Sequence, residues 1–162
     1  MKRIVGTVLF LIFAVMLAPP LARPSSPLPT YPADRRAIRP DTGERQRAQG
    51  LYLLTRGANR NLHWDACLAR KASLRAKQLV TQGYFDHRDP ATGRNPAWEL
   101  VTRCFSCRSA GENLAKGRDT PENIHKALMA SSTHRRNIMD PRFQRVGIAC
   151  YDDVCVELFA GF

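Results

Sequence analysis

Two histidines and one glutamate stand out as residues that could form a reactive or ligand-binding site. His87, Glu112 and His134 lie in three short stretches, residues 83–87 (GYFDH), 111–114 (GENL) and 131–138 (SSTHRRNI). A neutral imidazole nitrogen can bind a divalent metal ion, and a nearby carboxylate can orient an imidazole or act as a base toward a bound water. The three residues are far apart in the sequence, unlike the two histidines of a helical zinc motif. Only the fold can bring them together.

The same stretches, in this order, resemble the signature of the CAP superfamily, which includes cysteine-rich secretory proteins, insect venom antigen 5 and plant pathogenesis-related proteins. The bacterial branch is the most similar, on residues 62–65 (LHWD), the GENL stretch and the pattern S-x-x-H-R-x-N-I at residues 131–138. The resemblance runs from about Gln46 to the C-terminus. It implies an α+β fold, a three-layer α-β-α sandwich with a small antiparallel sheet, and a cleft that holds two histidines and two acidic residues.

The resemblance can be followed through the cleft residue by residue. His87 matches the family's first histidine, Glu112 its first acid and His134 its second histidine. The second acid is missing, since Ser131 stands near its place, and Ala127 replaces a tryptophan that is usual in that helix. The resemblance therefore implies a ligand groove lined by His87, Glu112, Ser131 and His134. If a cofactor such as zinc binds there, His87 and His134 are its expected ligands.

Three functions are compatible with such a groove. The first is a binding module for a small or lipidic ligand, a partner or another component of the cell envelope, and the resemblance favours it. The second is a metal-assisted hydrolase with Glu112 as the base, but a catalytic zinc site usually has three protein ligands and the motif offers two histidines. No nucleophile motif is present in the sequence. The third is a structural envelope protein with a vestigial cleft. Catalysis is the least favoured of the three.

Each of these residues also has a purely structural interpretation. Glu112 can accept hydrogen bonds from backbone N–H groups, and Asn113 can pin a turn with its side chain. Both cleft histidines can make internal hydrogen bonds instead of binding a ligand. Arg135 and Asn137 are expected to brace a loop rather than to touch a ligand.

The elements that must hold these residues can be predicted from apolar spacing and from cap residues. We expect helices at about residues 41–56, 65–82, 98–101 and 120–131. Strands at about 143–150 and 154–158 should form a hairpin that turns at Asp152 and Asp153. Residues 83–117 are predicted to be mostly loop. Helices on either side of an antiparallel pair, without strand–helix–strand alternation, indicate an α+β layered fold.

Five cysteines in so short a chain indicate disulfides and an oxidising compartment. A two-residue hairpin turn would place Cys150 opposite Cys155 in a non-hydrogen-bonded pair, where the side chains are close enough to bridge. Cys104 and Cys107 are predicted to form a local disulfide, with a redox pair or half a zinc site as alternatives. Cys67 is then left as a buried thiol.

The N-terminal part of the chain differs in composition from the rest. Residues 1–22 are predicted to be a signal peptide, because a basic start precedes an apolar run that is short for a membrane span; an uncleaved anchor is the alternative. Residues 23–40 are rich in Pro and Arg and are predicted to be a disordered tether. Residues 41–162 are enough for one hydrophobic core, so one CAP domain is expected there.

The formal net charge of +11 favours acidic surroundings such as envelope polymers or anionic headgroups. The basic residues are scattered without an aromatic-interleaved stripe, so nucleic acid is not expected as a partner. We therefore expect an exported monomer, in the periplasm or outside the cell, with no stable membrane span once the signal peptide is removed.

Overall fold

The computed structural model describes residues 41–162. The predicted signal peptide (1–22) and tether (23–40) lie outside the described residues. Within the described part, none of the helices has the length and apolar character needed to cross a membrane.

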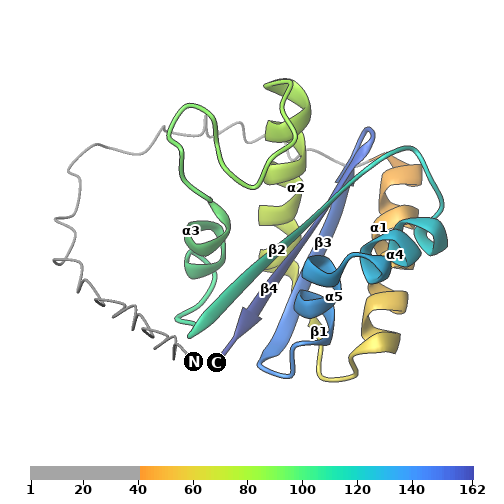
Figure 1. The fold of residues 1–162 in the computed structure, drawn as a ribbon, viewed down its shortest axis with the longest axis vertical. Coiled ribbons are helices and arrows are strands. Elements are labelled where there is room, and N and C mark those ends of the chain that lie inside the picture. Colours follow the sequence, from red (N-terminus) through yellow and green to blue (C-terminus); the bar gives the residue numbers. More distant parts are fainter. Residues whose placement is uncertain (1–40) are drawn as a thin grey trace, which may run out of the picture. The chain divides into compact units, whose positions relative to one another are not determined.

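A four-stranded sheet forms the middle of the domain (Figure 1). Its strands lie in the order β1 (His63–Trp64), β3 (Phe143–Tyr151), β4 (Val154–Gly161) and β2 (Ser109–Lys116). The long strands pair antiparallel, whereas the two-residue β1 pairs parallel to β3. The sheet was expected to be antiparallel, but its β1 edge is parallel, so the sheet is mixed. β2 is the other edge, which matters for the site because its backbone has only β4 beside it.

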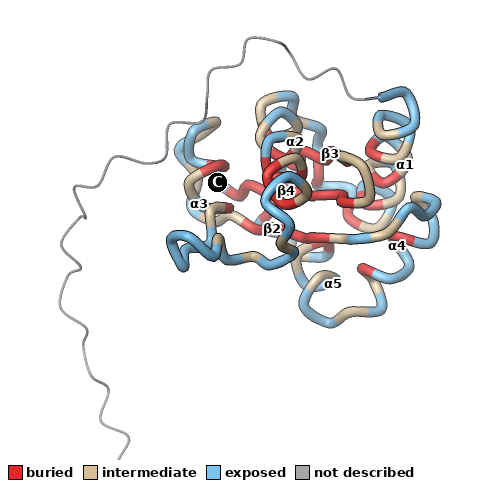
Figure 2. The backbone as a smooth tube through the Cα atoms, turned by 90° about the horizontal axis from the view of Figure 1, so that it is seen from above, coloured by how far each residue is buried: buried red, intermediate tan, exposed pale blue. Residues whose placement is uncertain are grey.

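Within residues 41–162, five helices cover the two faces of this sheet. Figure 1 shows α2 (Ala66–Thr81) and α3 (Ala97–Thr102) on one side, and α1 (Thr42–Ala58), α4 (Pro121–Ala130) and α5 (Ser132–Met139) on the other. Each side has its own apolar core, one including Leu68, Leu79, Val101 and Leu158, the other including Leu51, Ile124, Ile138 and Phe159. Buried positions accordingly follow the sheet and the inner helix faces in Figure 2. The α+β fold with three layers is confirmed.

Cap residues explain where three of the four helices predicted from sequence begin. Asp41 and Glu44 form a capping box at the start of α1. The carboxylate of Asp65 accepts a hydrogen bond from Leu68 N, 2.9 Å, at the start of α2. The hydroxyl of Thr120 accepts from Asn123 N, 3.3 Å, and α4 follows with a proline at its first position.

Three elements were not predicted: the two-residue β1, β2 and α5. β2 lies in the stretch expected to be loop, because its sequence SAGENLAK lacks the apolar alternation of a half-buried strand. Residues 111–114 are all buried nevertheless, including the polar Glu112 and Asn113. α5 lies where a braced loop was expected. Its sequence STHRRNIM buries only Ile138, so it carries almost no apolar periodicity.

One of the two predicted disulfides is confirmed and the other is wrong. Cys150 and Cys155 are bonded and occupy opposite positions in the β3–β4 register, as the hairpin prediction requires. Cys104 is bonded to Cys67 instead of Cys107, and Cys107 is a free, half-buried thiol. The reason is tertiary: Cys67 in the first turn of α2 and Cys104 just beyond α3 have Cα atoms 5.9 Å apart, within the usual range for a disulfide. Burial raises the pKa of the Cys107 thiol.

Candidate functional site

Glu112 is the buried centre of the site. It lies on β2 opposite Leu158, with its side chain toward the α2 layer and only 1% exposed. Oε1 accepts a hydrogen bond from Nε of Arg75, 3.0 Å, and Oε2 lies 2.8 Å from Nδ1 of His87. Of the two interpretations of Glu112, the structure does not show the acceptance of backbone N–H groups, since the partners of both oxygens within residues 41–162 are side chains. The carboxylate is thus a fixed anchor for the His87 ring, which is itself 43% exposed.

Arg75 of α2, whose side chain is fully buried, holds this anchor and was not singled out from the sequence. Besides Glu112, its guanidinium donates to the Tyr84 hydroxyl, 2.6 Å, to Gln78 Oε1, 3.2 Å, and to two backbone carbonyls, Asp86 at 2.8 Å and His87 at 3.3 Å. These bonds fold the loop after α2 back onto the helix and bring His87 above Glu112. The sequence did contain a signal for Arg75. It falls at helical spacing within the apolar stripe of α2, and a charged side chain buried there needs a partner.

His134 comes from the opposite layer. It lies on α5, and its ring centroid is 6.3 Å from that of His87, with the two rings tilted by 43°. The two imidazoles can approach because β2 is an edge strand, so groups from both faces of the sheet reach around it. Two histidines and one carboxylate that are far apart in the sequence are therefore adjacent in the structure.

Two asparagines tie α5 to β2. Nδ2 of Asn137 donates to the Glu112 carbonyl, 3.1 Å, and to Oδ1 of Asn113, 2.9 Å. Nδ2 of Asn113 donates in turn to the His134 carbonyl, 3.2 Å. Asn137 therefore braces the site strand rather than a loop, and Asn113 links a strand to a helix rather than pinning a turn. Arg135 bonds the Met129 carbonyl, 3.1 Å, and so joins α5 to α4.

A second buried acid, Glu157, extends this hydrogen-bond network to α1. Oε2 of Glu157 on β4 accepts from Nδ2 of Asn113, 2.9 Å, and Oε1 accepts from the Thr55 hydroxyl of α1, 2.8 Å. Burial is the largest cause that raises the pKa of Glu157, and the two hydrogen bonds oppose it. Glu157 was not predicted as part of the site. A lone glutamate between Val156 and Leu158 in a strand was its only visible signal.

The two imidazoles have opposite electrostatic environments. The hydrogen bond to Glu112 is the main cause that raises the pKa of His87. Burial, followed by the nearby charge of His87, lowers the pKa of His134. Between the two pKa values, His87 carries a proton while His134 is neutral. Over that range the pair offers one hydrogen-bond donor with positive charge and one neutral ring nitrogen.

A hollow of about 290 Å³ adjoins His134. Its apolar wall includes Leu114, Ile124, Ala127 and Leu128, and Ser131 lies beside His134 at its edge. The Ser131 hydroxyl is 3.1 Å from that of Thr133, so it has a local partner. The small side chain at Ala127 leaves part of this space open. The apolar hollow between β2 and α4 is thus lined by His134 but not by His87 or Glu112.

The ring nitrogens of His87 and His134 suit a divalent ion, but two ligands are too few to complete its coordination. His87 is oriented by Glu112 through Nδ1, which leaves Nε2 as the ring atom for a ligand, an arrangement common for metal-binding histidines. No cluster of three or more His, Cys, Asp or Glu side chains suited to a metal occurs among residues 41–162. Structural zinc sites have four protein ligands and catalytic ones usually three. An ion held by His87 and His134 would need its remaining ligands from outside residues 41–162.

The chain is similar to known bacterial proteins in both sequence and fold. The sequence model of the cysteine-rich secretory protein family, CAP, matches residues 37–156. The uncharacterized protein YkwD of Bacillus subtilis is 33% identical over 124 residues, which cover 76% of this chain and 44% of YkwD. An extracellular protein containing an SCP domain from Bacillus anthracis has a similar structure, with a TM-score of 0.64 and 25% identity over 74% of this chain and 41% of that protein.

More distant structures share the fold. A cysteine-rich secretory protein from Staphylococcus aureus has a TM-score of 0.61 and 15% identity over 76% of this chain and 41% of its own. An outer surface protein of Borrelia burgdorferi has a TM-score of 0.56 and 19% identity, over 70% and 92% of the two chains. The chain spans less than half the length of YkwD and of the Bacillus anthracis protein.

Proposed function

This chain belongs to the cysteine-rich secretory protein (CAP) family, and we propose that it is an exported binding module whose groove recognises its ligand through His87 and His134. The two disulfides fit an exported protein, because such bonds persist in oxidising compartments. The groove faces the periplasm or the exterior, where it takes a small or lipidic ligand or an envelope component.

The observation that carries this proposal is the engagement of both Glu112 oxygens. A hydrolytic base must reach a water molecule with a free oxygen. Glu112 is 1% exposed, and its oxygens contact Arg75 and His87. The carboxylate therefore suits orienting an imidazole better than activating water, which favours binding over hydrolysis.

In this proposal the groove has two halves, the pair of histidine rings and the hollow beside His134, and the ligand chemistry follows from them. Protonated His87 can donate a hydrogen bond to an anionic or carbonyl oxygen. Neutral His134 can accept a hydrogen bond from an N–H or O–H group, or coordinate an ion. The hollow beside His134 offers apolar walls to a short acyl or aliphatic group. If a divalent ion binds to the two rings, its open positions are available to oxygen atoms of the ligand. An amphiphilic molecule with an oxygen-bearing head fits both halves.

Zinc titration and turnover assays on the chain from residue 23 to 162 test the proposal. We expect zinc binding by calorimetry that is lost in H87A and in H134A and kept in H63A, an exposed histidine on β1 that serves as control. No turnover is expected on ester, peptide and glycan panels. Turnover that disappears in E112Q would instead establish a hydrolase. The absence of both zinc binding and lipid binding, with all variants folded, would leave a structural role and refute the binding module.

A further inference from the structure

A second groove, with a volume of about 510 Å³, lies between α1 and α2 and shares no lining residue with the hollow beside His134. Its floor is the part of β3 from Ile148 to Cys150. β1 pairs with β3 only at Arg145 and Val146, because the chain turns into α2 soon after Trp64. Beyond Val146, no strand of residues 41–162 adjoins this side of β3. The groove therefore lies over a free sheet edge.

The register of β3 with β4 shows which backbone groups face this edge, because the hydrogen-bonding direction alternates along a strand. Cys150 lies opposite Cys155 with Cα atoms 4.0 Å apart, the close spacing of a pair that exchanges no backbone hydrogen bonds. The N–H and C=O of Cys150 therefore point away from β4, and by alternation so do those of Ile148. Val146 follows the same alternation, since its carbonyl accepts from Asp65 N, 2.8 Å, on that side.

Ile148 and Cys150 form an open edge between two positions that have partners. At one end Val146 pairs with β1, and at the other the Asp152 N–H donates to Glu44 Oε1, 2.7 Å. The N–H and C=O groups of the open edge have no hydrogen-bond partner among residues 41–162, although Ile148 is only 1% exposed and Cys150 only 2%. Buried backbone polar groups are nearly always paired. The open edge is therefore suited to receive a further strand.

The shape of the groove suits a single extended segment. Along α1 it runs from Glu44 to Tyr52, about 12 Å at 1.5 Å per residue, which is the length of about four residues in a strand. Ala48 of α1 and Ala69 of α2 line it with small side chains. The open edge is recessed between these two helices, so the same edge of a second copy, flanked by the same helices, would not reach it.

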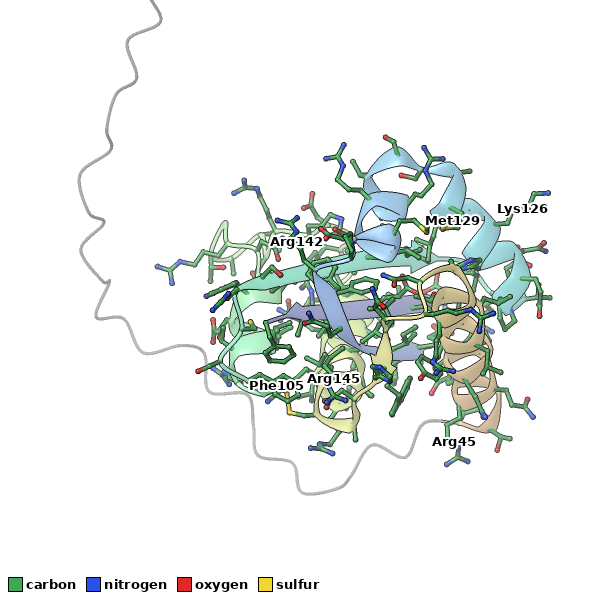
Figure 3. All side chains as sticks on the ribbon, turned by 90° about the horizontal axis from the view of Figure 1, so that it is seen from below. Arg45, Phe105, Lys126, Met129, Arg142 and Arg145 are labelled. Atoms are coloured by element: carbon green, nitrogen blue, oxygen red, sulfur yellow. A yellow bond between two sulfur atoms is a disulfide. The ribbon has the colours of Figure 1, made fainter. Side chains whose placement is uncertain are left out.

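The charges on the two walls favour an acidic segment. Arg45 lines the groove from α1 and Arg70 from α2, and both residues are exposed. Figure 3 shows Arg45 projecting from the first part of α1. Neither arginine forms an ion pair with a carboxylate of residues 41–162. The acid among the lining residues, Glu44, already accepts hydrogen bonds at both oxygens, from Asp41 N, 3.0 Å, and from the N–H of residue 152.

We propose that an extended, acidic segment of another protein binds in this groove as an added strand at the open edge. Its backbone pairs with Ile148 and Cys150 and supplies the affinity. Its side chains alternate between the α1 wall and the α2 wall, so two adjacent acidic residues face Arg45 and Arg70 from one strand. The proposal is independent of the histidine site, because neither His87 nor His134 lines this groove.

An NMR titration of the chain from residue 23 to 162 with the blocked peptide VEEVEEV tests the proposal, since this sequence places glutamates on both faces of a strand. We expect saturable downfield shifts of the amide protons of Ile148 and Cys150, because each gains a carbonyl acceptor. The amides of Gly147 and Ala149 are internal controls that should shift least, since they already face β4. The same peptide with methylated backbone nitrogens keeps its side chains but loses its donors, so it should bind at least about tenfold more weakly.

Charge reversal gives the second readout. R45E/R70E should weaken binding of VEEVEEV about tenfold or more and should bind VKKVKKV better than the natural chain does. R56E/K77E makes the same change of charge on α1 and α2 outside the groove and should leave binding of VEEVEEV unchanged.

Three results would overturn the proposal. The first is the absence of a saturable shift at Ile148 and Cys150 up to about 1 mM VEEVEEV. The second is equal binding of the methylated peptide, since the backbone would then not pair with the open edge. The third is a shift of these two amides that depends on protein concentration without peptide, because the occupant would then be a second copy.

Discussion

Replacing Arg75 by methionine should destabilise the domain strongly, although the side-chain length is nearly kept. The substitution removes five hydrogen bonds from a fully buried guanidinium and leaves the Glu112 carboxylate buried beside His87 alone. Breaking a buried ion pair by removing one partner costs about 3–5 kcal/mol. A domain with a total stability of about 5–15 kcal/mol would lose a large share of it. Urea denaturation measures this loss as a change in the free energy of unfolding.

Matched variants separate the effect of losing the Arg75–Glu112 ion pair from the effect of losing packing contacts. R70M makes the same change at an exposed position of α2 and should stay within about 0.5 kcal/mol of the natural protein. R75M/E112Q removes both charges, so it should be about 1–3 kcal/mol more stable than the sum of the two single changes predicts. An additive double variant, or an R75M that loses less than about 1 kcal/mol, would refute the assignment of Arg75 and Glu112 as a coupled buried pair.

The same variant changes the titration of His87. The positive charge of Arg75 lowers the pKa of His87, in opposition to the hydrogen bond that His87 donates to Glu112, which raises it. Removing Arg75 while Glu112 remains should therefore raise the pKa of His87 further. Proton NMR of the imidazole in folded R75M measures this shift. A decrease would show that Glu112 no longer contacts the ring.

Three further changes test other parts of the structure. Because burial raises the pKa of Glu157 above its reference of 4.5, the natural domain loses stability as the pH rises from about 4.5 through the folded-state value. E157Q should lack this loss, so urea midpoints should favour the variant increasingly with pH; a constant difference would contradict the assignment. A127W should fill the hollow beside His134 and weaken binding of an acyl ligand about tenfold or more, while zinc binding is kept. A130W, at a position that does not line the hollow, should leave both acyl-ligand binding and zinc binding unchanged. C104S should cost about 2–5 kcal/mol in the oxidised protein and C107S about 1 kcal/mol or less, by thermal unfolding; equal costs would contradict the disulfide pairing.

Local signals in the sequence were enough to predict the helices with caps and the hairpin. Asp41, Asp65 and Thr120 indicate helices because their side chains satisfy backbone N–H groups within the same few residues. The hairpin likewise fixes the Cys150–Cys155 pairing through its turn length. In all these cases the interacting groups are neighbours in the chain, so the pattern is complete in a short window.

Elements held by distant contacts could not be predicted in this way. β2 is a strand because β4 pairs with it and two layers bury it, not because of its own alternation. Cys104 meets Cys67 only after α2 and α3 have packed. In the site, the motifs located His87, Glu112 and His134, whereas Arg75 and Glu157 carry no motif and become visible only as buried charges with partners. Their roles in ligand recognition stay predictions.

The placement of the two imidazoles on opposite layers also offers a way to find the ligand. Any molecule that contacts both rings spans the edge of β2 and clamps α5 against the loop after α2. Such a molecule binds only while both layers are docked, so it stabilises the folded domain by mass action, by about 2.7 kcal/mol at a hundredfold excess over its dissociation constant. A thermal-shift screen of envelope lipids and small metabolites would therefore report on this clamp directly, without an activity assay and whatever the chemical class of the compound.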